Sequence, residues 1–294
     1  MRGFKTFFGL ACFATIAACN REGNKVFLAE PGQNAFVRFI NAIPDSGSQD
    51  WRFVDAVEGS PSIAGLPFRG IFPGATYQAA TAGRRHLKIF QSSLDPTFAD
   101  PTKTTPGIVS TVFVDSTFTL ETGKHYTIAA VGSLRAKTAK FVIITDEYTD
   151  PGTSIAVRAV NLGTPTALDV YTSPTGGTAA LPTTPFAAAL APFAATTWKT
   201  SAPAAFTLRA NAAGTTTLPA MVDAAAPAGV AADKVLNLSA IGGATIPGSA
   251  FTAFLFPPAT TGSLAAAVVA GTCPTRCATA GVIYAVDKYP PSGF

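Results

Sequence analysis

The chain has 294 residues, of which 48% are hydrophobic and only 13% are charged, and its formal net charge at pH 7 is +4. The charge balance excludes the strongly basic surface that nucleic-acid binding requires, so no nucleic-acid partner is expected. The length suffices for two ordinary domains, each with a core of its own.

The N-terminal residues are typical of a bacterial signal peptide. Arg2 and Lys5 form a short positive segment, and the apolar run 7–18 that follows is too short to span a bilayer. The run ends in the sequence IAAC, which resembles a lipobox, so Cys19 would become the lipidated first residue of the mature chain. The alternative is an ordinary secretory signal with a chance cysteine. Asn20, rather than an aspartate, favours the outer membrane by resemblance to bacterial sorting rules.

We therefore expect a signal peptide over residues 1–18 and a lipidated linker over residues 19–34. The protein would be lipid-anchored in the bacterial cell envelope and face the periplasm or the outside. Its membrane contact would be the acyl chains on Cys19.

Residues 35–149 predict a first β-rich domain. The stretches 35–40 and 85–90 alternate in side-chain character, as half-buried strands do, and turn residues such as Pro44-Asp45 and Pro73-Gly74 separate the apolar segments. Many short strands at close spacing are typical of a β-sandwich. The expected strands are 35–40, 49–53, 85–90, 111–114, 116–120, 125–131 and 140–145.

The chain contains a long internal repeat. The sequence VRFINA at 37–42 recurs as VRAVNL at 157–162, and Asp50 in QDWRF corresponds to Asp169 in LDVY. A repeat longer than 100 residues indicates duplicated domains rather than a solenoid. We expect a linker at 150–153 and a second sandwich over 154–294, with strands at 157–160, 168–171, 206–208, 235–238 and 251–256 and long loops at 173–200 and 211–232.

Charge is distributed unevenly between the two expected domains. Residues 20–153 contain 26 charged side chains, whereas residues 154–294 contain 10 and are rich in Ala, Thr, Pro and Gly. Surfaces poor in charge often mark contacts with other molecules. The second domain is therefore the better candidate for a surface that faces a partner.

The repeated segments resemble the DUF4397 family. The segment VRFINA, continued through Asp45 to DWRF at 50–53, is similar to the opening block of that family, and FTLETGKHYTIAAVG at 118–132 is similar to its second block. The resemblance covers residues 35–148 well, whereas the second domain lacks the Gly-Lys-x-Tyr-Thr piece. It implies tandem immunoglobulin-like antiparallel β-sandwiches outside the cytoplasm, and no established activity.

The motif residues themselves suit a structural role. Asn41 and Asp45 have short polar side chains that satisfy backbone groups in turns. Tyr126 follows a tight turn and could act as a corner residue with a buried ring and a bonded hydroxyl.

The sequence holds no recognisable catalytic constellation. Serine and threonine are plentiful, but no nucleophile elbow or Ser-x-x-Lys motif lies in a suitable context, so an enzyme, a metal site or a cofactor is not expected. Cys273 and Cys277 would be the remaining thiols in an oxidising compartment, and a local disulfide is predicted. A redox dithiol is the weaker alternative.

Four residues are candidate ligand contacts. Trp51 and Trp198 could stack on a glycan or small ligand, although tryptophans inside strands more often belong to a core. Arg84 and Arg85, with His86 and Lys88, could bind an anion such as a lipopolysaccharide phosphate, or could be a solvated basic strand.

Two functions remain open at this stage. The first is a structural or protein-interaction module, an accessory of an envelope assembly whose partner is another envelope protein or a glycan. The second is a periplasmic or surface lipoprotein that binds a glycan or another small ligand. An enzyme is the third and least supported reading.

Overall fold

The computed structural model describes residues 33–55, 62–74, 76–92, 112–218, 220–263 and 277–288. Cys19, its leader and Cys273 lie outside these ranges. Every regular element in the described residues is a β-strand, which confirms the all-β class. No helix of the length and apolarity needed to cross a bilayer occurs in the same ranges.

Nine strands belong to the first half of the chain. The predicted segments 111–114 and 116–120 form one continuous strand, β7, because Asp115 keeps an extended backbone opposite Lys88. The strands are β1 (Asn34–Asn41), β2 (Gln49–Phe53), β3 (Ser62–Leu66), β4 (Ile71–Phe72), β5 (Gln78–Thr81), β6 (Gly83–Gln91), β7 (Val112–Leu120), β8 (His125–Val131) and β9 (Lys140–Thr145).

Eight strands belong to the second half. They are β10 (Ile155–Asn161), β11 (Leu168–Ser173), β12 (Ala187–Leu190), β13 (Lys199–Ser201), β14 (Thr207–Ala212), β15 (Val222–Ala225), β16 (Ala250–Phe256) and β17 (Gly281–Lys288).

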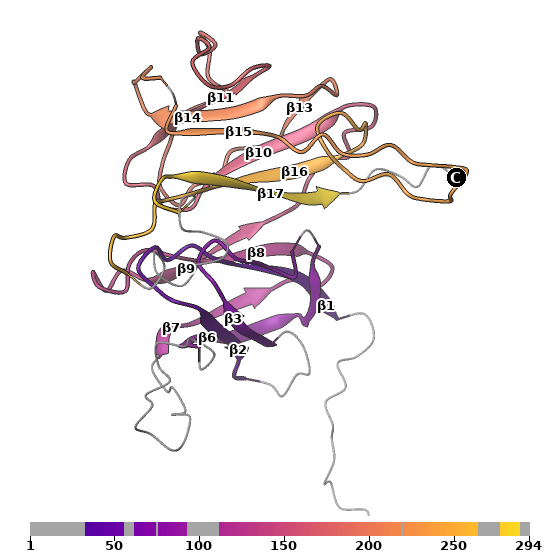
Figure 1. Cartoon of the computed structure of the whole chain (residues 1–294). Helices are drawn as coiled ribbons and strands as arrows, with labels where there is room; N and C mark the ends of the chain where they lie inside the picture. The colour runs from indigo at the N-terminus through magenta and orange to yellow at the C-terminus, as the bar shows by residue number, and fades with distance from the viewer. Residues whose placement is uncertain are drawn as a thin grey trace, which may run out of the picture.

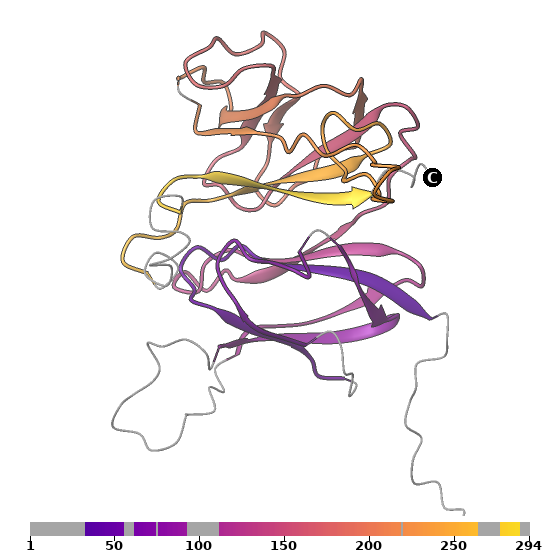
Figure 2. The same cartoon turned by 45° about the vertical axis from the view of Figure 1, so that its right-hand side comes forward.

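The strands form four sheets that stack as layers. Sheet A has the order β4-β1-β8-β9, with β5 also on β1, and sheet B has the order β3-β2-β6-β7. Sheet C has the order β13-β10-β16-β17, and sheet D has the order β12-β11-β14-β15. Sheets A and B enclose one apolar core, and sheets C and D enclose another; we call these pairs the first and second sandwich. Figure 1 and Figure 2 show the second sandwich on top of the first.

A further apolar layer joins sheet A to sheet C. Ile40 of β1 and Val160 of β10 point into it, together with Phe254 and Phe256 of β16. Side chains alternate along a strand, so Val37 and Phe39 of β1 fill the first core while Ile40 faces sheet C. Both faces of β1 and β10 are therefore buried, which explains why these strands lack an exposed polar face.

The strand directions differ from the expectation in one respect. Antiparallel sheets were expected, but β1 runs parallel to β8, and β10 runs parallel to β16. The remaining pairs are antiparallel, so sheets A and C are mixed. The two halves share this feature at equivalent places.

The second half departs most from its predicted elements. The expected loops 173–200 and 211–232 contain the short strands β12 and β15 and the start of β13. Their sequences, AAAL, VDAA and KTS, lack alternating large side chains and give no strand pattern. The expected strand at 235–238 is wrong: these residues form the exposed end of a hairpin, where apolar side chains meet solvent.

Three motif residues of the first sandwich hold turns, as predicted. Asn41 donates from Nδ2 to the Leu66 carbonyl and accepts at Oδ1 from the Ile43 amide, at 3.1 Å each. Tyr126 is buried, and its hydroxyl accepts a 3.0 Å hydrogen bond from the Glu121 amide, which confirms the corner role.

Asp45 anchors the loop that follows β8. Its carboxylate accepts hydrogen bonds from the Ser133 hydroxyl (2.7 Å) and from the amides of Leu134 and Arg135 (2.9 Å each). Burial alone would raise the pKa of Asp45, but these hydrogen bonds lower it below its ordinary value.

We expect Asp45→Ala to lower the free energy of unfolding by about 2–3 kcal/mol at pH 7, because several backbone and hydroxyl donors lose an ionised acceptor. The lowered pKa means that this stabilisation is present above the unfolded pKa of about 3.9 and is lost as pH falls through the folded pKa. Urea unfolding at several pH values checks both points. The difference between wild type and variant should shrink in acid. Glu147→Ala removes an exposed carboxylate and should cost no more than about 0.5 kcal/mol.

Candidate functional site

The structure places the two candidate tryptophans in different surroundings. Trp51 is 1% exposed and lies in the first core, with its ring edge-on to Phe39 at 5.5 Å and tilted against Phe141 at 5.5 Å. Trp198 is half-buried at the edge of the contact between the sandwiches. Trp51 is therefore a core residue, which was the alternative considered for tryptophans inside strands. The two tryptophan rings do not lie in one site.

The basic cluster on β6 is divided between two faces of the strand. Arg84 is exposed, whereas Arg85 is buried, pairs with Asp55 at 3.0 Å and lies 4.0 Å from the centre of the Phe53 ring. His86 and Lys88 both contact Asp115 on β7. Adjacent carboxylates thus balance most of this charge, and the four side chains do not converge on one point. Binding of an anion here stays a prediction.

Cys277 is 2% exposed and packs against Phe68 and Ala259, so it lies where the two sandwiches meet. Cys273 lies outside the described residues, and the predicted pairing of the two cysteines stays a prediction.

A buried cluster of charged side chains lies between sheets A and C, and it has two matching halves. In the first, Arg38 on β1 donates through Nε to the hydroxyl of Thr127, its neighbour on β8, at 3.2 Å. In the second, Arg158 on β10 donates through Nε to Thr252, its neighbour on β16, at 2.8 Å. Each threonine hydroxyl donates in turn to an aspartate of its own sandwich, Asp146 or Asp287.

The arginines then cross to the opposite sandwich. Arg38 donates through Nη2 to Asp287 at 2.8 Å, and Arg158 donates through Nη2 to Asp146. All four side chains are nearly fully buried, with exposures between 0% and 4%. Two positive and two negative charges balance, so the cluster is neutral as a whole. We call Arg38–Asp287 and Arg158–Asp146 the crossed ion pairs, because each joins an arginine of one sandwich to an aspartate of the other.

Tyr77 completes the cluster. Its hydroxyl lies 2.7 Å from Asp287 Oδ1 and 3.0 Å from Asp146 Oδ2, and its single proton can be donated to one of them at a time. Burial and the charge of Asp287 raise the pKa of Tyr77, so the hydroxyl stays protonated. Burial would lower the pKa of Arg38, but Asp287, Tyr77 and Asp146 raise it above its ordinary value. The arginine therefore remains charged.

Trp198 covers the outer side of this cluster. Its ring lies over the guanidinium of Arg158 at 4.5 Å, and its Nε1 donates to the Glu147 carbonyl at 2.7 Å. Tyr148 packs edge-on against it at 6.0 Å. In this position the ring of Trp198 covers the Arg158 guanidinium, and a contact between Trp198 and a ligand stays a prediction.

A second contact between the sandwiches surrounds Arg69. Its Nη2 donates to the Pro257 and Thr279 carbonyls of the second half, and Phe68 packs edge-on against Phe256 at 6.4 Å. The Thr260 amide donates to the Pro44 carbonyl at 2.8 Å. Contacts at both places fix the orientation of the two sandwiches.

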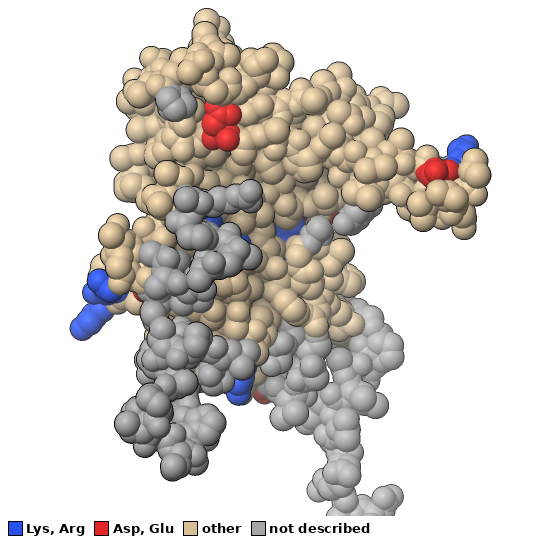
Figure 3. Space-filling model, viewed as in Figure 1, with Lys and Arg blue, Asp and Glu red and all other residues tan. Residues whose placement is uncertain are grey.

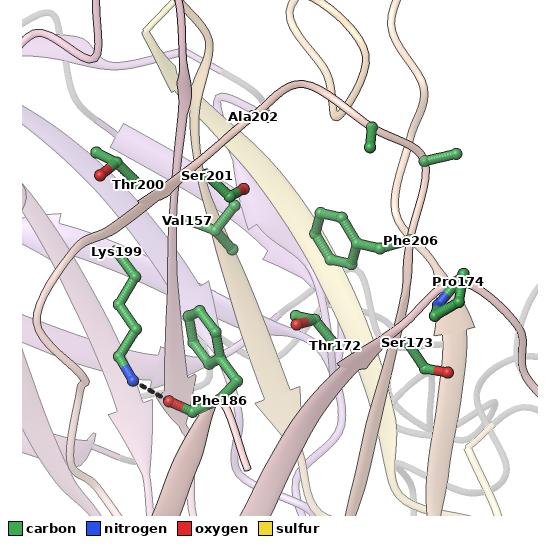
Figure 4. A pocket seen from close by; sticks show the side chains of 12 residues that line it. Val157, Thr172, Ser173, Pro174, Phe186, Lys199, Thr200, Ser201, Ala202 and Phe206 are labelled. Carbon is green, nitrogen blue, oxygen red and sulfur yellow. Dashed lines mark hydrogen bonds between the residues drawn. The ribbon is translucent and has the colours of Figure 1, made fainter. Parts of the chain in front are cut away.

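An open pocket of about 500 Å³ lies at one end of the second sandwich. Val157 of β10 and the rings of Phe186 and Phe206 give it apolar walls, and Thr172 lies at its edge (Figure 4). Lys199 of β13 is the one charged residue in the lining; its ammonium lies 4.8 Å from the centre of the Phe186 ring and donates to the Phe186 carbonyl. The size is that of a small-molecule site.

A hairpin over residues 227–246, which we call the arm, projects beside this pocket between β15 and β16. Figure 1 shows it reaching away from the body near the C-terminal end of the drawn chain. Figure 3 shows a projection there that is mostly uncharged but carries acidic and basic atoms near its end. Five large apolar side chains of the arm are exposed: Val230 is 58% exposed, Val235 93%, Leu236 66%, Leu238 56% and Ile241 53%. Lys234 and Asn237 are exposed beside them at the tip.

The arm is held in shape by its own backbone. Val230 and Ile241 exchange a pair of amide hydrogen bonds, and Asp233 and Leu238 exchange another at 2.9 Å each. The Asp233 carboxylate accepts from the amide of Val235 at 2.8 Å and closes the tip. Exposed apolar side chains gathered on one ordered element make the arm a candidate contact surface.

The arm was not predicted from the sequence, and the expectation that the second domain faces a partner stays a prediction. The segment VLNL at 235–238 was interpreted as a buried strand. A signal was present: Asp233 and Asn237, both turn-forming residues, lie within or next to it. The crossed ion pairs were not predicted either. The sequence did contain a signal for them, because Arg38 and Arg158 lie at equivalent positions within apolar strands of the two repeats.

We expect Arg38→Met to lower the free energy of unfolding by about 3–5 kcal/mol, because it leaves two buried carboxylates with one arginine between them. Urea unfolding measures the loss. Arg52→Met, at a side chain 59% exposed and 3.8 Å from Asp50, is the control and should cost less than about 1 kcal/mol. Equal losses in the two variants would contradict a stabilising role for the crossed pairs.

Comparison with known proteins gives one family. No curated protein matches the chain. The model of the family described as "Domain of unknown function (DUF4397)" matches residues 35–171, from β1 into β11. The match thus covers the whole first sandwich and the first two strands of the second, and over these residues the chain resembles the DUF4397 family.

Proposed function

We propose that this protein is a lipid-anchored envelope module with a structural or protein-interaction role, and that the arm is its contact surface. The arm carries the proposal: five large apolar side chains, each more than half exposed, lie on one ordered hairpin. Among the ten large apolar residues that are exposed in the described chain, these are the five most exposed. The signal sequence and the cysteine at position 19 support an anchor in the bacterial envelope.

The remaining parts of the proposal concern architecture. We infer that residues 154–294 are a second, degenerate DUF4397-like domain and that both sandwiches are immunoglobulin-like. The repeated strand order, the parallel pairs β1–β8 and β10–β16, and the matched roles of Asn41 and Asn161 support this. The Tyr126 corner resembles the tyrosine corner of immunoglobulin-like domains.

A small-ligand function is the second candidate. The pocket beside Phe186 and Phe206 favours it, because its volume and apolar walls suit a small molecule or a sugar ring. Under this alternative the protein would be a periplasmic or surface ligand-binding lipoprotein.

The anchor is tested at Cys19. We expect Cys19→Ser to move the protein from the membrane fraction to the soluble fraction, because acyl chains on this thiol supply the membrane affinity. Mass spectrometry of the wild-type N-terminal peptide should show an acylated cysteine. An unmodified Cys19 in membrane-extracted protein would overturn this part of the proposal.

The contact surface is tested by chemical crosslinking in intact cells. We expect the wild type to crosslink reproducibly to a protein in the envelope, and Val235→Asp with Leu236→Asp to abolish these crosslinks, because the tip becomes charged. Val54→Asp, at a side chain 44% exposed in the first sandwich, is the matched control and should leave them unchanged. A folded wild type that crosslinks to nothing would favour the small-ligand alternative.

A further inference from the structure

We propose that the pocket of the second sandwich binds an apolar monocarboxylate, and that Lys199 is the cation that holds the carboxylate. The small-ligand role proposed for this pocket is the basis, whereas a role of the arm in contacts is not required. Residues of both sheet C and sheet D line the pocket, so a ligand would enter the open end of the space between these sheets.

Lys199 lies on the face of sheet C that is turned toward sheet D. Its register partner on β10 is Val157, which is 3% exposed and belongs to an apolar cluster with Phe251. Residues that face each other on neighbouring strands project from the same face of a sheet. The side chain of Lys199 therefore extends from the edge strand β13 along the pocket wall, and its ammonium lies beside the apolar lining.

No carboxylate in the lining compensates this cation, because the described residues around the pocket include neither Asp nor Glu. Glu147, whose carbonyl accepts from Trp198 next to Lys199, has its carboxylate 3.5 Å from Lys124. The four acidic residues after position 154 also have other partners: Asp169 accepts from the amides of Ala189 and Gly214, Asp223 pairs with Arg209, Asp233 accepts from the Val235 amide, and Asp287 pairs with Arg38. A negative charge for Lys199 would thus come from a ligand.

The Lys199 ammonium keeps donors for such a ligand. An ammonium has three N–H donors, and one of them is used by the Phe186 carbonyl. The ring of the same phenylalanine lies 4.8 Å from the ammonium and helps to hold it at the wall. Two donors and one positive charge match the two oxygens and the single charge of a carboxylate, whereas a phosphate dianion would leave one charge unbalanced.

The remaining walls suit the apolar part of the ligand. The Phe206 ring stacks at 6.1 Å on the ring of Phe251, which is fully buried, so this wall is backed by the core. The Phe186 ring and Val157 line the same space (Figure 4). A volume of about 500 Å³ accommodates an alkyl chain of medium length, and its removal from water would supply most of the affinity.

The test is isothermal titration calorimetry on the purified full chain with Cys19→Ser, which would need no detergent. The probes are decanoate and its uncharged counterpart decanamide. We expect one decanoate site per chain, with an affinity at least about tenfold higher than that for decanamide, because the charge-assisted hydrogen bonds add to the same apolar contact. High salt should reduce this difference, since the two charges meet at an open mouth.

Three variants locate the site. Lys199→Met keeps the length of the side chain and should lower the affinity for decanoate at least about tenfold, with that for decanamide within about twofold. Lys140→Met is the matched control and should change neither, because the Lys140 ammonium also lies 4.8 Å from a phenylalanine ring, that of Phe193, and neither residue lines the pocket. Ala204→Trp, at an exposed position of the lining, should weaken both ligands by filling the pocket.

The outcomes separate this proposal from the small-ligand candidate. Equal affinities for decanoate and decanamide that Ala204→Trp abolishes would overturn the monocarboxylate and leave the small-ligand candidate intact. A folded chain that binds neither probe would overturn both. Binding that survives Ala204→Trp but is lost in Val235→Asp with Leu236→Asp would place the apolar probe on the arm, and decanoate affinity that Lys199→Met leaves unchanged would show that this lysine is only a charge on an edge strand; either result would overturn the proposal.

Discussion

The crossed ion pairs between sheets A and C are the constraint on which the rest of this structure depends. Arg38 and Arg158 are buried charges, and a buried charge is tolerated only when it is paired and hydrogen-bonded. Each obtains a threonine hydroxyl from its own sheet and a carboxylate from the other sandwich. Apolar contacts alone would permit sliding of one sheet over the other, whereas these directional contacts allow one orientation.

This constraint also explains where the exposed features lie. The central strands of sheets A and C are covered on both faces, so among the described residues a partner can reach the outer sheets B and D, edge strands such as β9 and β13, the loops and the arm. The arm and the pocket share the end of the second sandwich, and Figure 1 shows the arm clear of the contact between the sandwiches. Because the two sandwiches are joined in one orientation, the arm projects in a fixed direction. A fixed direction favours contact with a partner whose surface has a matching shape.

The fold class and much of the first sandwich could be predicted, because strands such as 35–40 and 125–131 carry strong apolar patterns and motif residues. Strands β12 and β13 could not, since short alanine- and threonine-rich edges gain their structure from neighbours rather than from a pattern. The partners of Arg38 and Arg158 could not be predicted from the sequence either. Asp287 and Asp146 contact these arginines only because the two sandwiches stack on each other. The arm was misread because apolar residues normally indicate burial.

The crossing of the pairs has an evolutionary consequence. Each half of the repeat contains an arginine whose carboxylate lies in the other half, so neither half can change its charge alone without leaving a buried ion unmatched. Substitutions should therefore be accepted in linked pairs that join position 38 to 287 and position 158 to 146. After a duplication, the loops and edge strands of the two halves can diverge independently. The buried charged positions between sheets A and C cannot, so the similarity of the two halves should persist longest there.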